Sequence, residues 1–82
     1  MWDPEFDDLL RRELPFLSSE EPLDDDLPLR DYGLDSLGTV QLLSALEATY
    51  QIRFSDDALT LETFRTPAVL WQALSAIRAA AN

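Results

Sequence analysis

The sequence predicts an all-α fold, a small four-helix bundle of three main helices and one short helix with a long first loop. Apolar residues recur at helical spacing in three separate segments of the 82-residue chain. Two of those segments begin with a polar residue followed by proline, Asp3-Pro4 and Thr66-Pro67, which is a typical start of a helix. A chain of this length forms at most one domain, so we expect a single domain over residues 1–82.

The first helix is predicted over about residues 4–13. Asp3 is the expected N-cap, and Pro4 is the expected first helical residue. Apolar side chains follow at helical spacing at Phe6, Leu9 and Leu10. Pro15 ends the helix, because proline lacks a backbone donor and disfavours a helical conformation in the residue before it.

Residues 14–35 form a long connection in which three prolines prevent a continuous helix. A loop of this length in a small domain is either functional or packed against the core. We expect apolar side chains to anchor it across the helices: Phe16, Leu17, Leu23, Leu27, Leu29 and Leu34. The acidic run at residues 24–26 is either a divalent cation site or a solvated turn, and we expect the solvated turn.

The second helix is predicted over about residues 36–51. Its N-cap is Asp35 or Ser36, since either side chain can accept hydrogen bonds from the free N–H groups of the first turn. The core-facing arc holds Thr39, Leu42, Leu43, Leu46 and Tyr50. Leu37 and Val40 fall outside this arc beside Ser36, so they are either ordinary exposed apolar residues or a docking patch. We expect the docking patch, with Gly38, Gln41, Ser44 and Ala48 also facing outward.

Two further helices are predicted in the last third of the chain. An extended apolar connection at residues 52–54 leads to a short helix over about residues 56–61, capped by Ser55 or Asp56. Phe64 is expected to fill the core. The last helix is predicted over about residues 67–79, and its core face holds Val69, Leu70, Ala73, Leu74 and Ile77.

The composition excludes several classes of function. The chain has no cysteine and no histidine, so it can form neither a Ser-His-Asp triad nor a thiolate or histidine metal site. A net charge of −10 opposes binding to nucleic acid and to anionic membranes, and favours basic protein partners. No segment is long and apolar enough to span a bilayer, and no secretory segment opens the sequence, so we expect a cytoplasmic protein.

One short run of residues is similar to a known family motif: Gly33-Leu34-Asp35-Ser36-Leu37. It resembles the attachment site of acyl carrier proteins and peptidyl carrier proteins. The likeness extends over about residues 4–80, through the pattern at Val40, Leu42, Leu43, Ala45, Leu46 and Glu47, the pair Asp56-Asp57 and a closing amphipathic helix. A phosphodiester at Ser36 would also suit a helix N-terminus, where anions are stabilised. The alternative is that Ser36 serves only as an N-cap.

The resemblance implies a non-catalytic carrier. Ser36 would bear a covalent 4′-phosphopantetheine arm taken from coenzyme A, with Asp35 beside it, and the thiol of the arm would hold acyl groups as thioesters. The implied partners are a phosphopantetheinyl transferase and an acyl- or aminoacyl-loading enzyme, acyltransferase or synthase with a basic and apolar docking surface. The residues expected to meet them are Leu37, Val40, Glu47, Asp56 and Asp57. We expect a monomer that binds no metal.

Two features favour a discrete carrier of polyketide or nonribosomal peptide biosynthesis over a fatty-acid synthesis carrier. The predicted second helix has a single acid, Glu47, whereas that helix is strongly acidic in fatty-acid carriers. The segment from Phe64 to Leu70 is similar to a Phe-x-x-Pro-x-x-Leu region of polyketide and peptide-synthetase carriers.

Two other classes of function remain as alternatives. One is an acidic helical protein-interaction module without a prosthetic group. The other is an enzyme with Ser36 and Asp35 as its nucleophile pair. We do not expect an enzyme, because a carboxylate next in sequence is a poor base for a serine and no other activating group is present.

Overall fold

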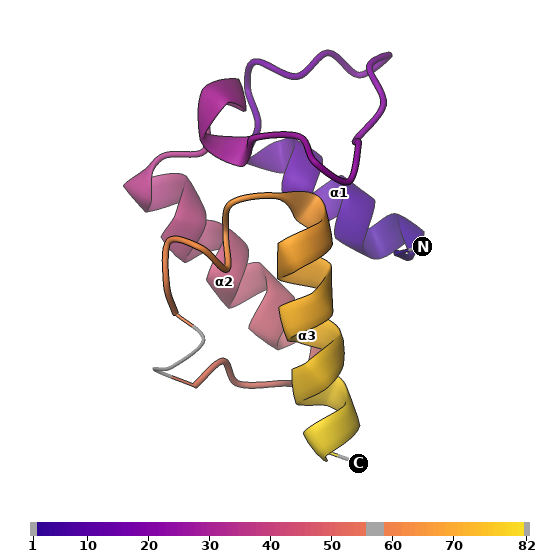
Figure 1. Cartoon of the computed structure of the whole chain (residues 1–82), viewed down its shortest axis with the longest axis vertical. Coiled ribbons are helices and arrows are strands. Elements are labelled where there is room, and N and C mark those ends of the chain that lie inside the picture. Colours follow the sequence, from indigo (N-terminus) through magenta and orange to yellow (C-terminus); the bar gives the residue numbers. More distant parts are fainter. Residues whose placement is uncertain (1, 56–58, 82) are drawn as a thin grey trace.

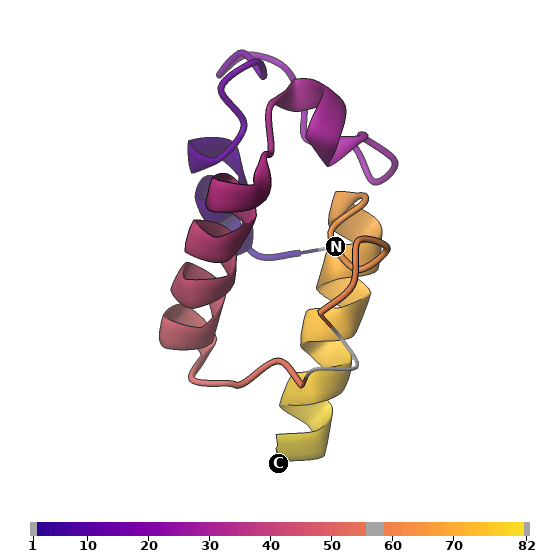
Figure 2. The ribbon, with the colours of Figure 1, turned by 90° about the vertical axis from the view of Figure 1, so that its left-hand side faces the viewer.

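The computed structural model describes residues 2–55 and 59–81. It contains three α-helices, α1 (Pro4–Arg12), α2 (Ser36–Tyr50) and α3 (Pro67–Ala81), and a short 3₁₀ helix η1 (Leu29–Tyr32). No strand occurs in these two ranges, which confirms the all-α prediction. Helix α1 runs antiparallel to α2, while α2 and α3 begin at the same end of the molecule (Figures 1 and 2).

The core is built from side chains of all three helices. The Asp3 carboxylate caps α1 by accepting the Phe6 N–H at 3.0 Å, and the helix ends at Arg12. Leucines of the three helices are fully shielded from solvent at Leu10, Leu42, Leu46, Leu70 and Leu74. Burying each such side chain stabilises the fold by about 1.5–3 kcal/mol. None of the helices in the described ranges is long and apolar enough to cross a bilayer.

A second contact region joins the start of the chain to the ends of α2 and α3. The Tyr50 hydroxyl donates a hydrogen bond to the Asp3 carboxylate, which is also the cap of α1. Arg78 of α3 lies over the Tyr50 ring at 5.0 Å, and Trp71 packs edge-on against Phe6. Burial and the neighbouring Asp3 carboxylate raise the pKa of Tyr50 above its ordinary range, so this hydrogen bond keeps its donor into the alkaline range.

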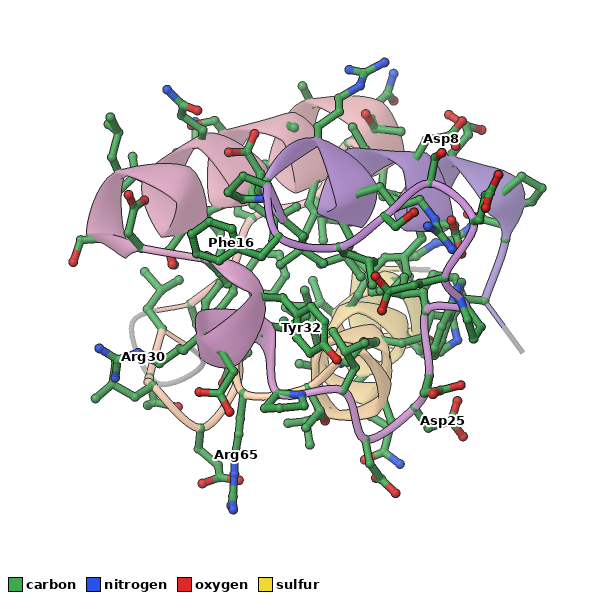
Figure 3. All side chains as sticks on the ribbon, turned by 90° about the horizontal axis from the view of Figure 1, so that it is seen from above. Asp8, Phe16, Asp25, Arg30, Tyr32 and Arg65 are labelled. Atoms are coloured by element: carbon green, nitrogen blue, oxygen red, sulfur yellow. The ribbon has the colours of Figure 1, made fainter. Side chains whose placement is uncertain are left out.

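The long connection before α2 is packed across the helices as predicted, with one exception. Four of its expected anchors are buried and Leu17 is half-buried; the buried ones are Leu23, Leu27, Leu29 and Leu34. Phe16 is 72% exposed, so its predicted anchoring role is wrong. The Phe16 N–H donates to the Tyr32 carbonyl at 3.1 Å, and this bond fixes the backbone of Phe16 beside the segment that joins η1 to α2 (Figure 3).

Helix η1 was not expected from the sequence, where these residues belong to the long connection. It ends at Gly33, whose φ of +104° lies in a region that favours glycine. A Cβ at this position would also approach the Pro15 side chain to 2.6 Å. This sharp turn delivers Leu34 to the core and directs the chain into α2.

The prediction of a short helix over residues 56–61 is wrong for residues 59–61. Residues 59–61 form a bend and the start of a turn, and residues 56–58 lie outside the described part of the chain. Threonine side chains replace helical bonds here, since the Thr63 N–H donates to the Thr60 hydroxyl at 3.2 Å. The fourth, short helical element of the fold is instead the 3₁₀ turn η1.

We expect the melting temperature to rise between low and moderate sodium chloride. Over residues 2–55 and 59–81 only two ion pairs form, Arg11–Asp7 and Arg65–Glu62, against a net charge of −10 for the whole chain. Residues 1–35 hold twelve acids and three arginines, so that half carries −9. Salt weakens the repulsion between exposed charges that lie further apart than the Debye length, which is about 10 Å at 0.1 M.

Calcium at equal ionic strength is the matched control for that measurement. No group of three or more acidic side chains within the described ranges is placed to hold a metal ion. Calcium should therefore stabilise no more than sodium does. A melting temperature that stays constant with salt, or tight stoichiometric calcium binding, would contradict the prediction.

Candidate functional site

The hydrogen bonds at the N-terminus of α2 show which of the two candidate residues is its N-cap. The Asp35 carboxylate accepts the Gly38 N–H at 2.7 Å, and the Asp35 carbonyl accepts the Thr39 N–H at 2.8 Å. Asp35 is therefore the N-cap, and Ser36 is the first helical residue. Leu34, which precedes Asp35, is buried and donates its N–H to the Leu29 carbonyl at 3.1 Å. The backbone before the cap is therefore fixed against the core.

Ser36 is exposed at the start of the helix. The first N–H groups of a helix have no intrahelical acceptor, and the cap satisfies only that of Gly38. The N–H groups of Ser36 and Leu37 thus remain at the positive end of the helix dipole. An exposed hydroxyl beside two backbone donors suits a phosphate ester attached to that hydroxyl.

We expect Asp35→Ala to destabilise the domain by about 0.5–2 kcal/mol and Asp35→Asn to cost much less. Alanine removes the acceptor for the Gly38 N–H, whereas asparagine keeps an oxygen that can accept it. Urea denaturation of the two variants measures the difference. Equal losses of stability would contradict the capping role and indicate that the negative charge is what matters.

The predicted outer face of α2 is exposed, with one correction. Leu37 and Val40 are 66% and 59% exposed, whereas Leu42 and Leu46 are fully buried on the opposite face. Gly38 was predicted to face outward, but it is buried. A Cβ there would lie 3.1 Å from the Asp35 carboxylate and 3.3 Å from that of Glu13, because the first turn of α2 packs against the chain that leaves α1.

A groove of about 300 Å³ opens beside Ser36. Its α2 wall includes Val40 and Leu43, and its upstream wall includes Leu34 and Arg30. The third wall comes from the connection before α3, at Leu59, Thr60, Leu61 and Phe64. The groove is therefore mainly apolar, and Ser36 lies in its lining.

Among the groove residues that no sequence pattern predicted at the site are Arg30, Leu59 and Leu61. Leu59 and Leu61 are 41% and 78% exposed, although both are large apolar residues. Leu59 and Leu61 lie far from Ser36 in the sequence, so no local pattern could link them to Ser36. They line the groove together with Val40, and only the tertiary structure brings these residues together.

The acidic residues expected at the site have different positions. Glu47 is half-buried, and its carboxylate accepts the Phe54 N–H at 2.9 Å, so it holds the chain after α2. It lies eleven residues after Ser36, about 16 Å along the helix at 1.5 Å per residue. Asp56 and Asp57 lie outside the described residues.

Comparison with known proteins identifies the family. A family model described as a phosphopantetheine attachment site matches residues 6–74, which is most of the chain. Comparison with curated proteins gives no significant match. Domains of the matching family are non-catalytic carriers with a covalently attached 4′-phosphopantetheine, and phosphopantetheinyl transferases modify them. Both the match and the exposed serine at the start of α2 lead to one conclusion: the chain belongs to the phosphopantetheine-binding family of carrier proteins.

Proposed function

We propose that Ser36 is the attachment residue and that the protein presents acyl, aminoacyl or peptidyl thioesters to partner enzymes of polyketide or nonribosomal peptide biosynthesis. The observation that carries the proposal is the exposed Ser36 side chain, which opens α2 at the edge of an apolar groove. The chain has no cysteine, so the thiol that forms a thioester must come from the prosthetic group.

The residues around Ser36 have complementary tasks in this proposal. Asp35 holds the first turn of α2 in place through the Gly38 N–H, and so fixes the backbone that carries Ser36. The backbone N–H groups of Ser36 and Leu37 favour the negative charge of the phosphodiester. The tether keeps a bound intermediate at high effective concentration near a docked enzyme, which supplies the catalysis.

Leu37 and Val40 form the proposed docking patch on the outer face of α2. Both are more than half exposed, and neither is needed to fill the core. An apolar anchor in the centre of a contact often contributes more binding energy than charges at its rim. The partner is an enzyme with an apolar pocket and a basic rim, attracted by the net charge of −10. Asp56, Asp57 and Glu47 remain proposed contributors to the acidic rim.

The choice of secondary metabolism is supported by the charges of α2. Its first turn has no acidic residue, and its single acid, Glu47, binds the Phe54 backbone. The outer face of α2 therefore offers apolar side chains to a partner in place of a row of carboxylates. A fatty-acid synthesis carrier is the alternative. We expect a monomeric protein that works in the cytoplasm.

The decisive experiment is phosphopantetheinyl transfer followed by intact mass measurement. The protein is incubated with coenzyme A and a transferase of broad specificity. Its mass should rise by one phosphopantetheine group. A protein that is never modified would contradict the carrier proposal and favour an acidic interaction module in which Ser36 is only the first residue of a helix.

A further inference from the structure

We propose that the Arg30 guanidinium binds the phosphodiester at Ser36 and so positions the first part of the prosthetic group along the groove. The inference rests on the proposed function, because it needs Ser36 to carry the group. Arg30 and Ser36 line the same groove, although they come from different elements, η1 and α2.

The backbone that carries Arg30 is firmly placed. Leu29, its neighbour in η1, is fully buried, and the Leu29 N–H donates to the Arg65 carbonyl at 3.1 Å. The Arg30 carbonyl accepts the Gly33 N–H at 3.2 Å, which closes the turn before α2. The Arg30 side chain extends from η1 toward the side of the molecule on which α2 begins (Figure 3). A flexible arginine on a fixed base can therefore reach a group at the start of α2.

A cation beside Ser36 would balance the negative charges of this part of the groove. Two charged residues occur in its described lining, Arg30 and Asp35, and the Asp35 carboxylate is already hydrogen-bonded to the Gly38 N–H. A phosphodiester at Ser36 adds a second negative charge next to Asp35. The Arg30 guanidinium offsets this repulsion. Within residues 2–55 and 59–81 the ion pairs are Arg11–Asp7 and Arg65–Glu62, so neither occupies Arg30.

Arginine also has the right shape for this task. Its planar guanidinium presents paired N–H donors that match two phosphate oxygens, which a lysine cannot reproduce. A carboxylate on the bound acyl group would offer similar anionic oxygens. We assign the contact to the phosphodiester, because that group is attached directly to Ser36 in the groove lining, whereas a carboxylate would lie at the far end of the arm.

The test compares unmodified and phosphopantetheinylated protein, each verified by intact mass. In wild-type protein the Nε–H resonance of Arg30 should shift on modification. The ³¹P resonance of the modified protein should move in Arg30→Gln, and Arg30→Lys should restore it only in part. Arg53→Gln is the matched control, since it removes the same charge from an exposed arginine outside the groove lining.

Each outcome separates the inference from the proposed function. Modification at Ser36 without a change in the Arg30 Nε–H resonance overturns the role of Arg30 and leaves the carrier function intact. A wild-type protein that gains no mass overturns the proposed function itself. A shift that occurs only with a carboxylated acyl group on the thiol, and not with a neutral one, overturns the assignment to the phosphodiester. The wild-type resonance decides the question even if Arg30→Gln fails to fold.

Discussion

Ser36→Ala is expected to abolish phosphopantetheinylation completely and to leave the helix content unchanged. The substitution removes the hydroxyl to which the group is attached, so no weaker attachment remains. The cap of α2 survives, because Asp35 and not Ser36 accepts the Gly38 N–H. An exposed substitution of this kind changes stability by about 0.5 kcal/mol or less. Intact mass and circular dichroism of the same sample measure both expectations.

Ser44→Ala is the matched control for this experiment. Ser44 is also exposed on α2, but it lies two turns further along the helix and outside the groove. The Ser44 variant should gain the full mass of one prosthetic group. A Ser36→Ala protein that is still modified would show that the attachment residue has been wrongly assigned, whatever the family.

Leu46→Ala is expected to lower the free energy of unfolding by about 2–5 kcal/mol, while Leu37→Ala changes it by about 0.5 kcal/mol or less. Leu46 is fully buried, so its truncation leaves a cavity, whereas Leu37 is 66% exposed. For a domain of this size the Leu46 variant should melt at least about 8 °C below wild type. Urea denaturation and thermal melts of the two variants and Val40→Ala check the contrast.

The same variants separate docking from folding. Leu37→Ala and Val40→Ala should slow loading by the cognate transferase or acyl-transferring enzyme, although both proteins remain folded. Glu47→Gln, which keeps an oxygen for the Phe54 N–H, should slow loading less than Leu37→Ala does. Unchanged loading of the Leu37 variant would show that it is an ordinary exposed leucine. A Leu37 variant as unstable as Leu46→Ala would place that side chain in the core.

The three main helices could be predicted because their signals are local. Asp3 caps α1 and Pro4 is its first residue, as the sequence predicts. At the start of α3, the Thr66 hydroxyl accepts the Val69 N–H at 3.3 Å. A cap needs only the residues of one helical turn, so the sequence contains all the information. The exposure of Leu37 and Val40 followed from helical phase in the same way.

The features that the sequence did not predict depend on contacts between distant segments. Phe16 is as apolar as its neighbour Leu17, yet its backbone is hydrogen-bonded to Tyr32 and its side chain is exposed. Gly38 lies on the polar side of the helical pattern, yet it is buried because Glu13 and Leu34 approach it. The helix predicted over residues 56–61 is not formed at its C-terminal end, because hydrogen bonds between Thr60 and Thr63 take the place of helical backbone bonds.

The sequence by itself determined the three main helices, the net charge and the position of Ser36 beside a helix start, since each depends on neighbouring residues or on simple counting. The tertiary structure alone decided what surrounds Ser36. Arg30, Val40 and Leu61 meet at one groove although they lie far apart in the chain. They meet because Gly33 reverses the chain before α2, and because the connection after α2 returns to the same end of the bundle before α3 begins (Figure 2).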